Sequence, residues 1–256
     1  MTGGATFAAA LALLAPGASG ASRDPASLAI AAWPARVVVV APGRTTIHVD
    51  NPSGEPVVID AAPSGYELDL RGRPRLRAAG TAGAWLAVRP AHIAVAPRST
   101  TAFTVTVARP PAARPGDHAL VVLLTTRLPA GRLVLAHLRV GVVVVARIPG
   151  VVVRRLTLGS LTVRRGARTR ALDVVVANRG SLDEWIGRRR LTVRLLRGGR
   201  LVATIQAAPR RLLAGTHGLV ELRCPRSLRG RLTAVVELAQ PSNGVARITR
   251  TIRLRL

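Results

Sequence analysis

The strongest constraint on the fold is the stretch at residues 103–126, FTVTVARPPAARPGDHALVVLLTT. Phe103, Val105 and Val107 alternate with threonines, which is the period of two expected of a half-buried strand. The prolines of residues 109–116 then interrupt the ladder, because proline donates no backbone hydrogen bond. A second apolar run follows them. The stretch therefore predicts two strands joined by a proline-rich crossing, as at a corner between the two sheets of a β-sandwich.

Similar strand signals recur along the chain at a spacing of roughly ten residues, which is typical of sandwiches and barrels. They lie at residues 27–33, 37–40, 45–50, 56–62, 65–70, 85–88 and 92–95, and again at 151–158, 161–165, 172–176, 191–195, 201–207, 220–224, 232–238 and 248–256. Turns rich in glycine, proline or asparagine separate them. The pattern predicts an all-β protein made of two consecutive immunoglobulin-like β-sandwich domains after an N-terminal signal peptide.

The most apolar run, residues 132–148, admits two interpretations. Its length approaches that of a membrane-spanning helix. His137, Arg139 and Arg147 argue against a helix of that kind, because a charge at the bilayer centre costs about 3 kcal/mol. The dense valines favour a buried strand instead. We predict a strand that ends before the Pro-Gly pair at residues 149–150, which marks the junction between the two domains.

The first 22 residues have the features of an export signal. An apolar run at residues 5–15 is followed by Pro16 and by small residues near a cleavage site. No arginine or lysine precedes the run, and the run is too short to span a bilayer. A buried helix is the alternative, but the run has no polar face. The predicted division is a signal peptide at residues 1–22, a first domain at 23–148 and a second domain at 149–256.

The charge of the chain is strongly positive and unevenly distributed. The chain holds 38 arginines, no lysine and 12 acidic residues, for a net charge of +26. Residues 28–146 carry 13 arginines and 6 acids, a net of +7, whereas residues 147–256 carry 24 arginines and 5 acids, a net of +19. Either the composition reflects GC-rich coding sequence, or the second domain binds an anionic partner. Aromatic residues make up only 2%, which argues against nucleic acid as that partner.

Catalytic and metal-binding motifs were sought and not found. Cys224 is the single cysteine, so the chain forms no internal disulfide and no cysteine metal cluster; its alternation with Val220 and Leu222 indicates core packing. The five histidines do not pair with other ligands at metal-site spacings. No nucleophile elbow, Walker loop or dinucleotide-binding turn is present. We therefore expect no enzyme activity, no metal and no cofactor, although a site assembled from distant residues would escape this search.

One local cluster is a candidate binding site. Trp185 follows two acids and precedes Arg188, Arg189 and Arg190. A tryptophan beside three arginines can stack on a sugar ring or hold an anion. The alternative is that Trp185 covers the edge of the core while the arginines are solvated. Tyr66, in the segment GYELDL, is a further candidate contact.

Several turns and corners together resemble a known family. The motifs are the export signal, a strand leading into Asn51-Pro52, a tryptophan followed by Pro90, the Pro-Arg-Ser turn at residues 97–99, the proline-rich crossing, the valine-rich run ending at residues 147–150, the Asn-Arg-Gly turn at 178–180 and the Gly-Gly hairpin at 198–199. Over residues 28–256 this pattern resembles the WxL-interacting cell-surface proteins of Gram-positive bacteria.

The resemblance implies a non-enzymatic surface protein with two immunoglobulin-like domains. It implies that the first domain binds peptidoglycan or another wall polymer, and that the second binds a host or surface protein. The expected location is secreted and associated with the cell wall. Members of that family usually end in a transmembrane helix, whereas this sequence stops in a predicted strand, so we expect no transmembrane helix in the mature chain.

A second hypothesis is a periplasmic chaperone of the pilus type, which also has two immunoglobulin-like domains. Such a protein offers an exposed edge strand to a partner. It predicts an L-shaped pair of domains with a basic cleft that holds the C-terminus of the partner. Asn51 or the first strands would carry this role. An enzyme built on a β-sandwich is a third hypothesis, and a pocket with convergent polar groups would favour it.

Overall fold

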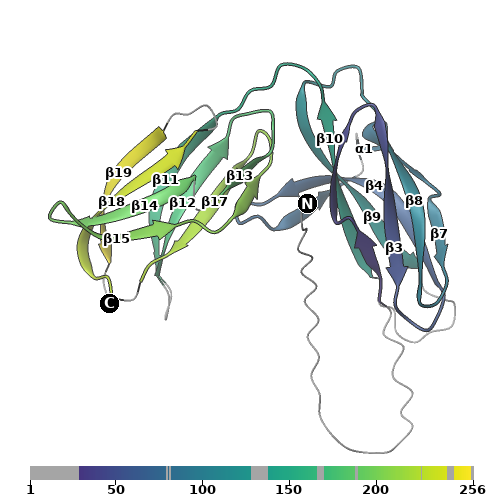
Figure 1. The fold of residues 1–256 in the computed structure, drawn as a ribbon, viewed down its shortest axis with the longest axis horizontal. Helices are drawn as coiled ribbons and strands as arrows, with labels where there is room; N and C mark the ends of the chain where they lie inside the picture. Colours follow the sequence, from purple (N-terminus) through teal and green to yellow (C-terminus); the bar gives the residue numbers. More distant parts are fainter. Residues whose placement is uncertain are drawn as a thin grey trace, which may run out of the picture.

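The computed structural model describes residues 29–78, 80, 82–127, 138–165, 170–187, 190–225, 227–240 and 245–254. The expected signal peptide and part of the valine-rich run, residues 132–137, lie outside these residues. The described chain forms two lobes, each built of strands (Figure 1). We call β1–β10 the first lobe and β11–β19 the second lobe. The all-β class and the pair of immunoglobulin-like sandwiches are thereby confirmed.

The first lobe consists of two facing sheets. One has the order β1-β3-β8-β6, and the other has the order β2-β10-β9-β4-β5 with β7 paired to β4. The elements are β1 (Ala31–Trp33), β2 (Arg36–Val40), β3 (Gly43–Asn51), β4 (Val57–Leu68), β5 (Pro74–Arg77), the single-turn helix α1 (Ala82–Trp85), β6 (Leu86–Arg89), β7 (His92–Val95), β8 (Ser99–Val107), β9 (Gly116–Arg127) and β10 (Arg139–Ile148).

The second lobe repeats the sandwich plan with sheets of the order β11-β12-β17, β13-β16 and β15-β14-β18-β19. Its strands are β11 (Leu156–Arg165), β12 (Arg170–Asn178), β13 (Glu184–Ile186), β14 (Leu191–Arg197), β15 (Arg200–Gln206), β16 (Arg210–Leu212), β17 (His217–Arg223), β18 (Gly230–Ala239) and β19 (Val245–Leu254). No described strand of one lobe belongs to a sheet of the other.

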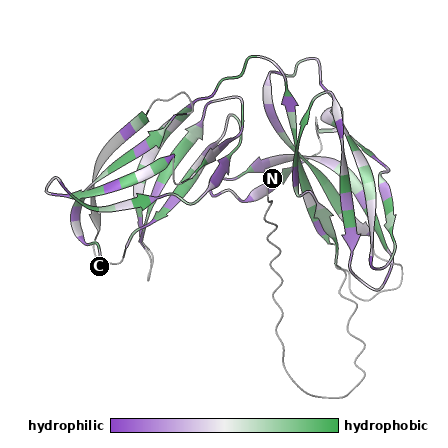
Figure 2. Ribbon diagram, viewed as in Figure 1, coloured by the Kyte–Doolittle hydropathy of each residue, from purple (hydrophilic) through white to green (hydrophobic). Residues whose placement is uncertain are grey.

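Alternating side chains build the core of each lobe. Phe103, Val105 and Val107 on β8 are buried, and Thr106 between them is exposed. The same alternation appears as green and purple bands along the strands in Figure 2. The predicted crossing is confirmed, because β8 and β9 lie in different sheets on either side of the proline-rich segment. Valine, leucine, isoleucine and alanine make up nearly all of both cores, as the low aromatic content requires.

Each lobe also holds one buried asparagine at the end of a strand. The Asn51 side-chain amide donates to the backbone carbonyls of Glu55, Val95 and Ala96 at 2.7, 3.2 and 3.1 Å. The Asn178 side chain donates to the carbonyls of Leu182, Leu212 and Leu213 at 2.7, 3.3 and 3.2 Å in the second lobe. Both residues are almost fully buried. The turns predicted at these asparagines are therefore fixed to the core by three hydrogen bonds each.

Some segments differ from the prediction. No strand was predicted between residues 70 and 85, but this segment includes β5, which pairs with the end of β4, and most of α1. The strands predicted at residues 56–62 and 65–70 are one strand, β4. β11 begins at Leu156 rather than at residue 151, and the short strands β13 and β16 were not predicted. These two strands have only three residues each, too few to give a periodic signal.

Candidate functional site

An ion-pair network lies where the two lobes meet. The carboxylate of Asp117 on β9 accepts two hydrogen bonds from the Arg147 guanidinium, at 2.7 and 2.9 Å, and one from the backbone N–H of Asp183 at 3.0 Å. The Asp183 carboxylate accepts from the Arg36 guanidinium at 2.6 Å and from the backbone N–H of Ala214 at 3.0 Å. Both carboxylates are buried. Because buried charges are stable only when paired, this network fixes the lobes against each other.

The Asp117 carboxyl group of the network remains ionised at neutral pH. Burial alone would raise the pKa of Asp117, but hydrogen bonds from Arg147 and from the Asp183 backbone outweigh it and leave the pKa below its ordinary value. The pKa of Glu184, the residue after Asp183, is lowered for a similar reason. Burial alone would raise it, but hydrogen bonds from Arg154 and Arg190 outweigh that effect. Asp117 and Glu184 are therefore permanent counter-charges.

Gly116 allows the two lobes to approach this closely. Its φ is +130°, and a Cβ atom placed on it would lie 2.2 Å from the backbone oxygen of Ser181 in the second lobe. The next residue, Asp117, donates its backbone N–H to that same oxygen at 2.7 Å. Only glycine combines the positive φ with the absence of a side chain. The sequence marks this position merely as a turn.

The edge of β10 is only partly covered. Parallel pairing with β2 begins at Val143, which lies opposite Arg36, and the Val143 N–H donates to the Ala35 carbonyl at 3.0 Å. Backbone groups alternate in direction along a strand, so those of Arg139 and Gly141 point to the same side as those of Val143. Among the described residues, no strand pairs with them on that side. β10 therefore offers a short open edge that ends where β2 begins.

The side chains along this edge continue the sandwich. Val142 is fully buried in the core, and Val140 packs partly against it. Gly141 lies on the opposite face, where a Cβ atom placed on it would be 3.1 Å from the Val121 side chain. A strand added at this edge would extend an existing sheet and could place alternate side chains over the apolar margin of the core.

A pocket of about 290 Å³ lies between the lobes at the point where the open edge ends. The outward face of the sheet that contains β2, β10 and β4 forms one side of it, and the second lobe forms the other. Its lining residues include four arginines and no acid: Arg36, Tyr66, Leu68, Arg71, Gly72, Val143, Arg210, Arg211 and Leu213. Such a lining favours an anionic ligand group.

Arg211 on β16 is a partly buried cation of this pocket. Its guanidinium makes no direct ion pair with a described acid, although Asp183 and Asp117 attract it from a distance. Burial lowers the pKa of its guanidinium, and repulsion from Arg36 lowers it further. The guanidinium carbon lies 4.5 Å from the ring centre of Trp185, which is a cation–π contact. A carboxylate bound between Arg211 and Arg36 would relieve this repulsion.

The predicted site residues lie partly around this pocket. Tyr66 lines it, and burial raises the pKa of its phenol. Trp185 is 53% exposed and connects to the pocket through its contact with Arg211. Arg190 is not available to a ligand in the same way, because it donates to the Glu184 carboxylate at 2.6 Å. Arg188 and Arg189 lie outside the described residues.

Sequence reasoning missed Arg36, Arg211 and the Asp117 network. These residues come from strands far apart in the sequence, and no local pattern connects them. The only available signal was an arginine at the head of the Val-Val-Val-Val run in β2. Asn51, which was named as a possible contact of a chaperone-type protein, is instead a buried structural residue.

Other kinds of site were also sought. The described residues contain no group of three or more histidine, cysteine, aspartate or glutamate side chains placed to hold a metal ion. Within the same residues, no helix has the length and apolar character needed to cross a membrane.

The comparisons with known proteins give a match in structure only. No model of a protein family matches the chain, and no curated protein matches it. The class 5 fimbriae chaperone CfaA aligns with a TM-score of 0.51 at 10% identity, over 89% of this chain and 100% of that one. The CupB2 chaperone of Pseudomonas aeruginosa aligns with a TM-score of 0.44 at 16% identity, over 88% and 100%. The CsuC–CsuE chaperone–tip adhesion complex of Acinetobacter baumannii aligns with a TM-score of 0.45 at 12% identity, over 89% and 99%.

The predicted resemblance to WxL-interacting cell-surface proteins is therefore wrong. The fold is instead similar to the class 5 fimbriae chaperone CfaA, at a TM-score of 0.51. The predictions drawn from the resemblance to WxL-interacting proteins are wrong as well: the wall-binding function, the peptidoglycan partner and the association with the cell wall. The motifs behind it were turns and corners, which any pair of immunoglobulin-like sandwiches requires.

Proposed function

We propose that this protein is an exported chaperone that holds an extended segment of a partner protein as an added strand on β10. The single observation that carries the proposal is that the open edge of β10 ends at Arg36, beside a pocket lined by four arginines. A segment running parallel to β10 along Arg139 and Gly141 would continue the line of β2 and would arrive at Arg36. Its C-terminal carboxylate would then lie between Arg36 and Arg211.

The chemistry of each part supports this role. Backbone hydrogen bonds to an edge strand give affinity without requiring a particular sequence, which suits a chaperone. A carboxylate that meets guanidinium groups in a sheltered pocket forms strong, directional hydrogen bonds, and these would fix the register of the added strand. The two-lobed fold that this chain shares with a fimbrial chaperone of similar length is consistent with such use. The partner would be a subunit of a surface fibre whose exposed edge needs cover before assembly, and the location would be the periplasm.

Peptide binding tests the proposal. The probe is a fluorescein-labelled nine-residue peptide of alternating valine and threonine with a free C-terminal carboxylate, and its matched control is the same peptide with a C-terminal amide. We expect the amide to bind at least about tenfold more weakly, since losing a sheltered charge pair costs 2 kcal/mol or more. Arg36→Gln and Arg211→Gln should each remove most of this discrimination. Arg200→Gln, at an exposed position on β15, should leave it intact.

Equal binding of the two peptides to the wild-type protein would contradict the carboxylate site. Absence of binding by either peptide would contradict the proposed function as a whole. Affinity that is the same for both peptides and disappears in 0.5 M salt would indicate a nonspecific arginine surface instead.

A further inference from the structure

The β4–β5 hairpin extends beyond the sheet from which it starts. β4 pairs with β9 up to Gly65, whereas its residues from Tyr66 to Leu68 pair with β5 alone. In Figure 1 this blue hairpin reaches from the first lobe across to the second. We call residues 65–77 the arm and residues 69–73 its tip. A two-stranded ribbon of this kind is only marginally stable by itself, so contacts at its tip decide where it lies.

The tip is ordered by one aspartate. The Asp69 carboxylate accepts the backbone N–H groups of Arg71 and Arg73 at 2.8 and 2.9 Å, and the Gly72 N–H donates to the Asp69 backbone oxygen at 2.8 Å. The hydrogen bond from the Arg73 backbone is the main reason that the pKa of Asp69 is lowered. Gly72 adopts a φ of +81°. The tip is therefore a preformed turn rather than a loose loop.

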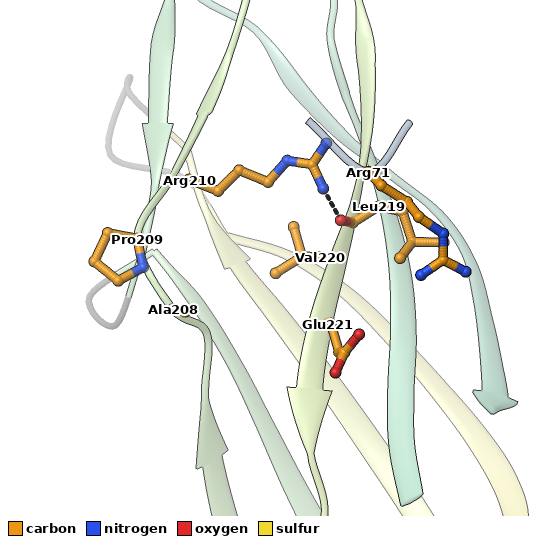
Figure 3. A pocket seen from close by; sticks show the side chains of 7 residues that line it. All are labelled: Arg71, Ala208, Pro209, Arg210, Leu219, Val220 and Glu221. Carbon is orange, nitrogen blue, oxygen red and sulfur yellow. Dashed lines mark hydrogen bonds between the residues drawn. The ribbon is translucent and has the colours of Figure 1, made fainter. Parts of the chain in front are cut away.

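The tip docks on the second lobe through its backbone. The Leu219 N–H on β17 donates to the Leu70 carbonyl at 2.6 Å. The guanidinium of Arg210 donates to the same carbonyl at 2.6 Å and also to the carbonyl of Leu219. Figure 3 shows Arg210 extended toward Leu219, with Arg71 of the tip on the far side of that residue. Burial lowers the pKa of the Arg210 guanidinium. The carbonyl oxygens of Leu70 and Leu219 stabilise its charge by accepting its hydrogen bonds.

The docked tip also closes the pocket between the lobes. Leu68, Arg71 and Gly72 of the arm line that pocket together with Arg36 and Val143. A Cβ atom on Gly72 would lie 3.2 Å from the Arg210 guanidinium, so there is little room between the tip and the second lobe. The pocket is thus entered past the open edge of β10 and bounded by the arm.

We propose that the arm is a stop that makes this site selective for a partner segment that ends in the pocket. The proposal rests on the proposed function. It adds the structural element that limits how far the partner segment can extend past Arg36. A volume of about 290 Å³ lies at the lower limit of ligand sites and holds a chain end. An extended chain rises about 3.3 Å per residue, so four further residues add about 13 Å. They would have to displace the tip from Leu219 and Arg210.

The test compares two peptides of the same core sequence. One is the nine-residue valine–threonine probe with a free carboxylate, and the other carries Gly-Ser-Gly-Ser after its ninth residue. We expect the wild-type protein to bind the extended peptide at least tenfold more weakly. In a variant whose residues 69–73 are replaced by Asn-Gly, the ratio of the two affinities should fall toward one. Because both peptides are measured on the same variant, a general loss of affinity cancels in the ratio.

A milder variant keeps the test decisive if the shortened arm does not fold. Gly72→Val introduces a branched side chain at a φ of +81° and against Arg210, which should loosen the tip and lower the ratio severalfold. Gly199→Val is the matched control, because Gly199 also has a φ of +81° but has no atom within 4 Å of the added Cβ. It should leave the ratio unchanged.

Each outcome decides a different claim. If the wild-type protein binds both peptides equally well, the stop is refuted while the proposed function stands. If neither peptide binds, both are refuted. If the wild-type protein discriminates but the arm variants discriminate equally well, some other wall of the pocket sets the selectivity and the role of the arm is refuted.

Discussion

The two lobes share the same sandwich fold and differ in the strand edges and charged side chains that they bring to the junction. In each lobe, one buried asparagine at the end of a strand donates to three backbone carbonyls, from Asn51 in the first and Asn178 in the second. In each, the amide oxygen also accepts the backbone N–H of the residue two positions later. The second lobe, however, carries a net charge of +19 over residues 147–256, against +7 over residues 28–146. The first lobe supplies an open strand edge, and the second supplies Arg210 and Arg211.

This difference indicates how a repeated fold acquires one function. The asparagines stabilise both sandwiches in the same way and say nothing of ligands. In the proposed function the chemistry lies at the junction, where the open edge of the first lobe meets arginines from both lobes. We propose residues 23–148 and 149–256 as the two domains. The predictions below test whether they are stabilised in the same way and differ in charge and at the junction.

The largest expected effects come from the two asparagines. Asn51→Ala and Asn178→Ala each leave three buried carbonyls without a donor, so each should lower the free energy of unfolding by about 3–4 kcal/mol. Urea unfolding, followed by circular dichroism, measures this loss. Thr46→Ala, at an exposed position on β3, should cost much less. A large effect at one asparagine and none at the other would break the equivalence of the two lobes.

The junction should respond to both mutation and acid. Asp117→Asn should lower the free energy of unfolding at pH 7 by about 2 kcal/mol, less than for a fully buried pair, because solvent screens the half-exposed Arg147. The folded-state pKa of Asp117 and of Glu184 is lowered. Their stabilisation is therefore fully present above the ordinary values of 3.8 and 4.5, and it is lost as the pH falls through the lowered values.

Unfolding measured from pH 7 down to pH 2 tests this account. The wild-type protein should lose stability below about pH 4, and Asp117→Asn should lose less over the same range. An identical acid slope in the variant would show that Asp117 does not contribute to it.

The smallest expected effect is a difference between the two lobes in how strongly each binds an anionic resin. The second lobe should account for most of the retention of the protein on an anionic resin. Paired charge reversals at exposed positions, Arg200→Glu in the second lobe and Arg98→Glu in the first, should each shift elution to slightly lower salt. The shift should be larger for Arg200→Glu. Equal shifts would show that the second lobe contributes no more to retention than the first.

Much of the fold could be predicted from local pattern, and little of the site could. The alternation along residues 103–107 reflects one buried and one exposed face of a strand, so β8 was located correctly. The first half of the arm, residues 65–70, was predicted as a strand, but β5 in its second half was not, because the side chains of β5 are exposed on both faces and leave no period. Arg36 and Arg211 meet only after both sandwiches have folded and packed together. Tyr66 and Trp185 were chosen for their chemistry, and the structure brings both to Arg211.

The central claim is that the open edge of β10 accepts a strand that ends at Arg36. Hydrogen–deuterium exchange of the backbone amides of Arg139 and Gly141, with and without the nine-residue valine–threonine peptide, tests it most directly. We expect the peptide to slow exchange at both amides, and to do so far less in Arg36→Gln. The amides of β15, on the outer edge of the second lobe, should be unaffected. Protection on β15 with none on β10 would contradict the claim.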